Sequence, residues 1–317
     1  MTSTNGFTYA LVTPVRSEAE NLARLAASID AQTVPPERWV IVDNGSEDST
    51  LDLAGELART RQWVRVISIP GEERPVPGAP IVRAFHAGLD ELDRPLPGIV
   101  VKLDADTSMD PDHFERLLAA FAADPRLGIA SGTCLELDDD GQWRPIAVTD
   151  GHVRGAARAY RRECLEQVVP LEERVGWDGV DELKAAVLGW TTRMLPDLAF
   201  RHHRRLGARD GAPTARWRAQ GSASWFMGYR FSYLLLRSLH RARRDPAALA
   251  MVTAYVGAAA RREPRLADAR VRAHLRRSQR LRALVGRFVE SRHRADAEIS
   301  ADGQLRPEGT VPMTSEE

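Results

Sequence analysis

The N-terminal part of the chain alternates short apolar runs with segments of helical periodicity. The apolar runs have the length and composition of buried strands, and they cover residues 9–13, 39–42, 64–69, 99–103 and 129–135. Between them, apolar side chains recur at helical spacing in residues 18–32, after Ser49, in 81–92 and in 112–123. Strands that alternate with helices predict an α/β fold with a mostly parallel sheet flanked by helices on both faces.

Two helix starts have recognisable capping residues. Ser49 is of a type that caps the helix that follows it. Asp110 and Pro111 are typical of an N-cap and a first helical residue, which predicts that the helix over 112–123 begins there.

The pattern changes after about residue 205. Residues 225–240, 246–261 and 266–288 are predicted to form amphipathic, arginine-rich helices, and residues 296–317 are polar enough to be disordered. We therefore expect a first, α/β domain over 1–205, in two halves at roughly 7–135 and roughly 136–205. A helical region over 206–295 and a disordered tail over 296–317 would follow it.

Acidic and polar residues gather where three of the predicted strands end, at residues 14–18, 43–48 and 104–106. Ligands bind parallel α/β sheets at the carboxyl ends of the strands. Asp104 and Asp106 are two positions apart, so in extended backbone both carboxylates would point to one side. Such oxygen ligands suit Mg²⁺ or Mn²⁺ held together with substrate phosphates, although the alternative is a solvated acidic loop.

Other polar residues are candidates for substrate contacts. Residues 43–46 form either an ordinary turn or a contact to a base and ribose. Arg83 is either surface charge or a diphosphate ligand. Asp178 and Asp181 precede or begin a predicted helix, where each is either a helix cap or a general base. His202 and His203 are either surface histidines or a source of a neutral imidazole for the metal.

The charge of the chain is balanced overall but unevenly distributed. The formal net charge is zero, yet residues 201–294 contain 23 arginines and five acidic residues. This excess predicts contact with something anionic. No apolar stretch reaches the roughly 20 residues that span a bilayer, and residues 1–5 show no signal peptide. With two isolated cysteines, the sequence favours a cytoplasmic protein.

Taken together, these segments resemble the family 2 glycosyltransferases of the GT-A fold over roughly residues 7–205. The resemblance rests on four segments, which are residues 13–18, 42–50, 102–107 and 176–189. It implies an inverting transferase that uses a divalent cation, Mg²⁺ or Mn²⁺, and a nucleotide-diphosphate sugar donor.

The resemblance also implies roles for individual residues. The donor is expected to bind residues 7–135, the nucleotide-sugar half, through Pro14, Arg16, Glu18, Asp43 and Asp104, and the acceptor to bind residues 136–205. The metal is expected to bind Asp104 and Asp106. Arg83 as a further donor contact and His203 as a further metal ligand are expected from the residues alone, without the resemblance. The family's acidic base motif corresponds to Trp177-Asp178, which favours Asp178 over Asp181 as the general base.

The C-terminal region resembles a subgroup of bacterial polysaccharide-assembly enzymes in residues 225–229 and 275–281. This implies a glycan or lipid-linked acceptor. Arginines interleaved with aromatic residues favour a peripheral position on the inner face of the membrane, with anionic headgroups as partners. The alternative is that these aromatics pack against the catalytic domain. The arginine count also fits nucleic acid, but no recognition motif accompanies it, so no nucleic-acid partner is expected.

Three other classes of protein share parts of this pattern. A haloacid-dehalogenase-like phosphatase also has Asp-x-Asp after a buried strand, but Ser108 stands where that motif has Thr or Val. A nucleotidyltransferase would need a glycine-rich basic loop that residues 10–24 lack. The complete set of acidic residues disfavours a catalytically silent nucleotide-sugar-binding protein.

Overall fold

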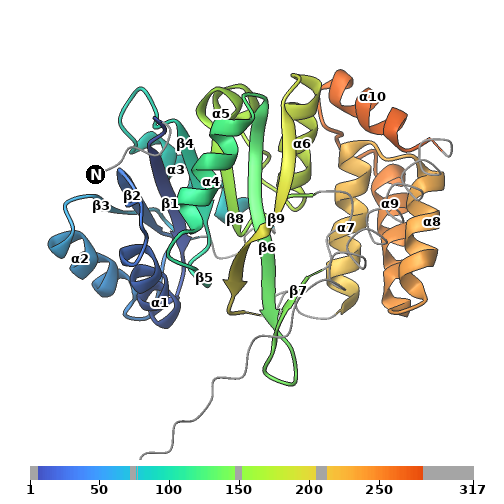
Figure 1. Cartoon of the computed structure of the whole chain (residues 1–317). Helices are drawn as coiled ribbons and strands as arrows, with labels where there is room; N and C mark the ends of the chain where they lie inside the picture. Colours follow the sequence, from blue (N-terminus) through green and yellow to red (C-terminus); the bar gives the residue numbers. More distant parts are fainter. Residues whose placement is uncertain (1–5, 72–75, 77, 147–151, 205–212, 281–317) are drawn as a thin grey trace, which may run out of the picture.

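The computed structural model describes residues 6–71, 76, 78–146, 152–204 and 213–280 (Figure 1). Its centre is a single sheet with the strand order β3-β2-β1-β4-β8-β6-β9-β5, and β7 pairs with β6. The strands are β1 (Tyr9–Val15), β2 (Arg38–Asp43), β3 (Val64–Ser68), β4 (Ile99–Leu103), β5 (Thr107–Met109), β6 (Leu127–Leu137), β7 (Trp143–Pro145), β8 (Ala157–Arg161) and β9 (Thr191–His202).

The sheet is parallel on its N-terminal side and mixed beyond β4. Strands β3, β2, β1 and β4 run parallel, whereas β8 is antiparallel to both β4 and β6. Strand β9 is parallel to β6 but antiparallel to β5. The α/β fold predicted from the sequence is confirmed, and the neighbouring positions of β2, β1 and β4 bring the three polar strand ends together.

Helices cover both faces of the sheet. Helices α1 (Ala19–Asp30), α2 (Thr50–Thr60) and α4 (His113–Ala123) pack one hydrophobic core against it. Helices α3 (Ala79–Asp90), α5 (Arg162–Val168) and α6 (Trp177–Val187) pack a second core on the opposite face. Both cores are built from the apolar stripes that the periodicity predicted.

The two predicted caps are wrong in detail. The Ser49 side chain makes no capping bond; instead Asp48 accepts a hydrogen bond from the backbone N–H of Thr50, at 3.0 Å. Helix α4 begins only at His113, with Asp112 at the N-cap. The Asp110 side chain does not cap this helix and instead pairs with Arg201, at 2.9 Å.

Strand β8 was not predicted, because two of its five residues are arginines. Both arginines are buried, and their charges are satisfied inside the protein. Arg158 pairs with Asp181, and Arg161 donates to the carbonyl oxygens of Phe121 and Leu127. Strand β8 is therefore a central, buried strand even though its sequence is partly polar.

The C-terminal helices form a compact extension beside α6 (Figure 1). They are α7 (Pro213–Met227), α8 (Phe231–Ala242), the 3₁₀ helix η1 (Pro246–Leu249), α9 (Ala250–Ala260) and α10 (Ala269–Ser278). One apolar cluster joins Val180 of α6 to α7 and α10, and another joins α7, α8 and α9 around Trp217. The predicted helix over 225–240 is broken, because Gly228 adopts a positive φ between α7 and α8.

None of the helices within the described ranges is both long and apolar enough to cross a membrane. The predicted tail over 296–317 and the end of the predicted helix over 266–288 lie outside the described residues.

Candidate active site

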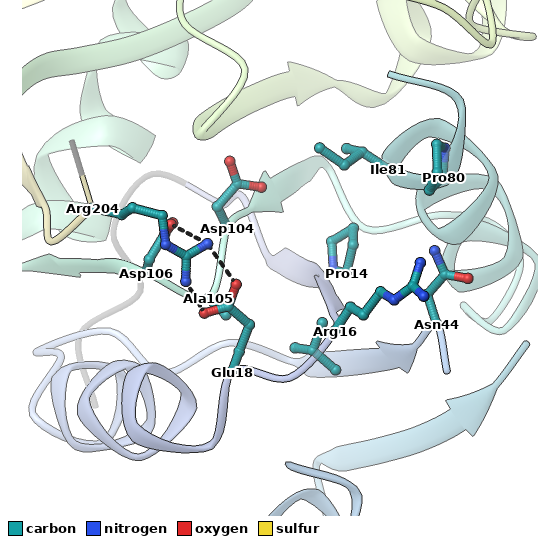
Figure 2. A pocket seen from close by; sticks show the side chains of 11 residues that line it. Pro14, Arg16, Glu18, Asn44, Pro80, Ile81, Asp104, Ala105, Asp106 and Arg204 are labelled. Carbon is teal, nitrogen blue, oxygen red and sulfur yellow. Dashed lines mark hydrogen bonds and ion pairs between the residues drawn. The ribbon is translucent and has the colours of Figure 1, made fainter. Parts of the chain in front are cut away.

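A pocket with a volume of about 330 Å³ opens at the carboxyl ends of β1, β2 and β4 (Figure 2). It is lined by Pro14, Val15, Arg16, Glu18, Asn44, Pro80, Ile81, Asp104, Ala105, Asp106 and Arg204. Five of the residues predicted to contact donor or metal therefore meet in one cavity, in the size range of small-molecule sites.

Glu18 and Asp43 face different surroundings. The Glu18 carboxylate, which is almost fully buried, accepts two hydrogen bonds from the Arg204 guanidinium, at 2.8 and 2.5 Å. Asp43 instead closes the turn after β2, because its carboxylate accepts the backbone N–H groups of Gly45 and Ser46. Gly45 supplies the positive φ that this turn requires, and Asn44 rather than Asp43 lines the pocket.

Asp104 and Asp106 do not lie on one extended strand. Ala105 and Asp106 form a turn between β4 and β5, so the two carboxylates approach the pocket from different directions (Figure 2). Asp104 pairs with Lys102, and burial raises the pKa of Asp104 despite that partner. An Asp106 oxygen lies 3.4 Å from an Arg204 nitrogen.

His202 is the histidine that faces Asp106. Its Nε2 lies 3.4 Å from an Asp106 oxygen, and its Nδ1 lies 3.3 Å from Glu136. Burial opposes ionisation of Asp106, but the hydrogen bond and charge of His202 hold the pKa of that carboxyl below its usual value. The His203 ring contacts the Ser108 hydroxyl at 2.7 Å instead. Successive side chains at a strand end point to opposite sides, so only one histidine of the pair reaches the carboxylates.

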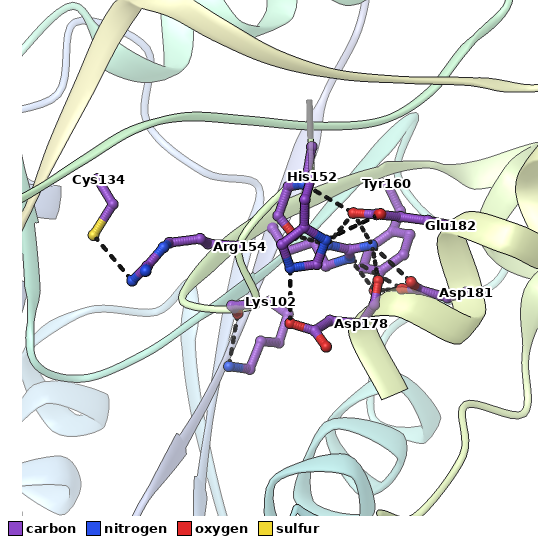
Figure 3. Close-up of polar contacts among 11 residues, drawn as sticks. Lys102, Cys134, His152, Arg154, Tyr160, Asp178, Asp181 and Glu182 are labelled. Carbon is purple, nitrogen blue, oxygen red and sulfur yellow. Dashed lines mark hydrogen bonds and ion pairs between the residues drawn. The ribbon is translucent and has the colours of Figure 1, made fainter. Parts of the chain in front are cut away.

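A second polar cluster lies at the start of α6, where Asp178 is partly exposed (Figure 3). His152 bridges two acids, with its Nε2 at 3.5 Å from Asp178 and its Nδ1 at 3.1 Å from Glu182. Burial alone would lower the pKa of His152, but its hydrogen bonds to Asp178 and Glu182 raise that pKa to about 9. The same contact with His152 lowers the pKa of Asp178 against the effect of burial, so this carboxylate is ionised at neutral pH.

Asp181 is buried one turn further along α6. Its two oxygens accept from the Arg158 guanidinium, at 2.6 and 3.0 Å, and one of them also accepts from the Tyr160 hydroxyl. Only 1% of the residue is exposed. With its oxygens engaged inside the protein, Asp181 ties α6 to β8 and does not reach a cavity.

Lys102 connects the two clusters. Its ammonium is buried, pairs with Asp104, and donates to the Gly155 carbonyl at 2.8 Å. It also lies 5.6 Å from the ring centroid of Trp177, which is the residue before Asp178 in the sequence. The absence of a side chain at Gly155 matters here, because a Cβ would lie 2.9 Å from the Trp177 ring and 3.7 Å from an Asp178 oxygen.

The residues present fit a hard divalent cation. The Asp104 and Asp106 carboxylates border one open pocket, and the His202 imidazole lies 3.4 Å from Asp106, so this set of oxygen and nitrogen donors suits Mg²⁺ or Mn²⁺. Cys134, Glu136 and His202 also lie close enough to share an ion. However, burial raises the pKa of Cys134 to about 11, and Arg154 lies 3.8 Å from Glu136. This second group is therefore better suited to orienting His202.

Arg83 lies apart from the pocket-lining residues. It is on α3, where it pairs with Glu173 at 2.6 Å. The structure adds Lys102, His152 and Arg204 to the candidate residues, and it favours Asn44 among residues 43–46 and His202 in the histidine pair. One sequence signal was available for Lys102, since it is one of only two lysines in the chain and stands inside an apolar strand. The others depend on tertiary contacts.

Comparison with known proteins gives consistent results. The family described as Glycosyl transferase family 2 matches residues 10–168. Polyprenol monophosphomannose synthase of Mycolicibacterium smegmatis is 29% identical over 178 residues, which cover 50% of this chain and 63% of the relative. The match thus spans less than two thirds of that relative's length.

Two solved structures share the fold. Mannosyltransferase PcManGT from Pyrobaculum calidifontis, in complex with GDP-Man and Mn²⁺, aligns with a TM-score of 0.56 at 19% identity, over 80% of this chain and 75% of its own. S. aureus TarS 1-349 in complex with UDP-GlcNAc aligns with a TM-score of 0.53 at 16% identity, over 69% of this chain and 66% of its own. The chain belongs to glycosyl transferase family 2 and has the GT-A fold.

Proposed function

We propose that the protein transfers a sugar from a nucleotide-diphosphate sugar to an acceptor hydroxyl, with inversion and with Mg²⁺ or Mn²⁺. The observation that carries this proposal is the division of the acidic residues between two places. Asp104 and Asp106 border the pocket at the strand ends, whereas Asp178 stands apart on α6. One group is suited to a charged donor and the other to a proton transfer.

On the donor side, Asp106 and His202 would hold the cation together with Asp104. When bound, the cation neutralises diphosphate charge and stabilises the leaving group. Pro14, Arg16 and Asn44 line the part of the pocket proposed to take the nucleoside. Arg204 supplies a positive charge beside the same carboxylates, and it would pair with diphosphate oxygens.

On the acceptor side, Asp178 is proposed as the general base. Its carboxylate is ionised and reaches a cavity, so it can accept the proton of an acceptor hydroxyl as that oxygen attacks the anomeric carbon. A single displacement of this kind inverts the anomeric configuration. Asp181 remains the alternative base named by the sequence, but its oxygens are engaged by Arg158 and Tyr160.

The donor assignment is tested by thermal shift with UDP-, GDP- and dTDP-sugars. GDP-mannose and UDP-GlcNAc come first, because the two structural relatives bind them. We expect one donor to raise Tm only when Mn²⁺ or Mg²⁺ is present, since ligand at 100 times its Kd stabilises by about 2.7 kcal/mol. EDTA should remove the shift. Retained anomeric configuration in the NMR spectrum of the product would contradict the proposed inversion.

We also propose that the enzyme acts in cell-surface polysaccharide or glycoconjugate assembly, peripherally on the inner face of the membrane. Trp217 and Phe226 pack inside the helical extension, which removes them from any membrane contact. Support comes instead from α8, where Phe231, Leu236 and Leu239 are 45–50% exposed. Exposed arginines follow at its C-terminal end, as in helices that lie at anionic surfaces.

Sedimentation with phospholipid vesicles tests this position. We expect pelleting with anionic but not neutral vesicles, with binding that weakens as salt rises, because each basic residue contributes about 1 kcal/mol near such a surface. Leu236→Ser combined with Leu239→Ser should reduce pelleting. Leu51→Ser on α2 is the matched control, because Leu51 is 43% exposed in a distant part of the molecule. Equally weak pelleting with both lipids at low salt argues against membrane association.

A further inference from the structure

A second cavity, with a volume of about 660 Å³, lies between α6 and the C-terminal helices. Asp178, Glu182 and His152 border it on the side of the catalytic domain. Residues of α7, α8 and α10 form its other walls. Apart from His152, its lining residues fall outside residues 10–168, so this wall is built from a part of the chain that the family does not describe.

The lining of this cavity combines aromatic rings with hydrogen-bonding side chains. The rings of Tyr229 and Tyr233 lie 5.7 Å apart between centroids, and both line the cavity. Gln220 and Gln279 line it too. Their amide oxygens accept from Arg237 and from the Arg230 backbone, at 3.1 and 2.8 Å. The amide nitrogens make no hydrogen bond to another described residue, which leaves N–H donors facing a ligand.

The charges around the cavity disfavour an anionic ligand. Asp178 and Glu182 present carboxylates to it, and these offset the positive charges of His152 and Arg237, so the lining offers a phosphate no net positive charge. Arg237 is the arginine among its lining residues, and it is already hydrogen-bonded to Gln220. Tyrosine rings, amides and hydroxyls suit a neutral ligand that has both apolar ring faces and many hydroxyl groups.

We propose that this cavity is the acceptor subsite and that it binds the saccharide part of the acceptor, with the Tyr229–Tyr233 pair as its platform. The inference rests on the proposed function, because it takes Asp178 as the base. A sugar ring packed on the tyrosines directs one hydroxyl to Asp178, while the glutamine amides donate to neighbouring hydroxyls. The bound saccharide is either a free glycan or the glycan portion of a lipid-linked acceptor, and in both cases the cavity recognises the sugar.

The experiment measures binding of four methyl glycosides, those of mannose, glucose, galactose and N-acetylglucosamine, by saturation-transfer NMR on the full chain. We expect at least one to bind the wild type. Tyr233→Ala and Gln220→Ala should each weaken its binding by about tenfold, because truncating a central contact removes most of its energy. Tyr233→Phe, which keeps the ring, should bind as the wild type. Ser232→Ala is the control on the same helix, since Ser232 is exposed and does not line the cavity.

Two further measurements distinguish a failure of the acceptor subsite from a failure of the proposed function. Farnesyl phosphate in detergent micelles tests a lipid-phosphate ligand; its binding is expected to be unaffected by Tyr233→Ala. The proposal is overturned if no methyl glycoside binds, or if both cavity variants bind it as the wild type does. Loss of farnesyl phosphate binding in Tyr233→Ala would also overturn it. Donor thermal shift on the same samples distinguishes the outcomes, because a normal donor shift with no saccharide effect rejects only the acceptor subsite.

Discussion

We expect Asp106→Ala to eliminate the metal-dependent stabilisation by the proposed nucleotide-sugar donor and to lower turnover by on the order of 100-fold or more. The physical reason is that the Asp106 carboxylate borders the proposed donor pocket beside Arg204, with His202 at 3.4 Å. Without it, the cation loses a carboxylate ligand and the diphosphate loses the charge that would hold it. The measurement is Tm with donor, with and without Mn²⁺, followed by steady-state turnover.

Asp110→Ala is the matched control for this substitution. Asp110 lies four residues later in the chain, and its exposed side chain pairs with Arg201 at 2.9 Å outside the pocket. We expect this variant to keep the donor shift, because surface ion pairs contribute about 1 kcal/mol or less. If Asp106→Ala turns over as fast as the control, the proposed metal site is wrong.

Asp178→Asn keeps the shape of the side chain but removes its ability to accept a proton. We expect kcat to fall by about 10²–10⁴, with the donor-induced shift in Tm unchanged. The two results together separate acceptor activation from donor binding, which involves the residues around Asp106. The assay is transfer to an acceptor at saturating donor, with folding checked by circular dichroism.

Asp181→Asn provides the contrast, because the two aspartates lie on the same helix. Here we expect the free energy of unfolding to fall by about 3 kcal/mol, since buried Arg158 loses its main counter-charge. Denaturant unfolding measures this directly. If Asp181→Asn instead abolishes turnover without loss of stability, and Asp178→Asn remains active, Asp181 is the base.

The sequence predicted the parts of the fold whose signals are local. The edge strand β3 is apolar although only partly buried, and strands β1, β2, β4 and most of β6 appear as apolar runs because they are buried on both faces. Strand β8 has the same environment but contains Arg158 and Arg161. Its burial depends on partners far along the chain, which a periodicity count does not detect.

The candidate site follows the same division. The polar residues at the ends of β1, β2 and β4 line one pocket, as expected, because neighbouring parallel strands end at one edge of the sheet. The choice between His202 and His203 depended on which face of the end of β9 meets the carboxylates, and that is decided by strand pairing. The contribution of Arg204 and the cavity beside α6 depend on segments that meet only in the folded chain.

The buried ammonium of Lys102 makes the donor and acceptor sides energetically interdependent. It pairs with Asp104 on one side and lies over Trp177, next to Asp178, on the other. A change of charge at Asp104 on donor binding therefore alters the electrostatic potential at the proposed base, and by thermodynamic reciprocity acceptor binding alters donor affinity by the same factor. Cooperative binding of the two proposed substrates then requires no moving lid, only one lysine that pairs with Asp104 and lies over the ring next to Asp178.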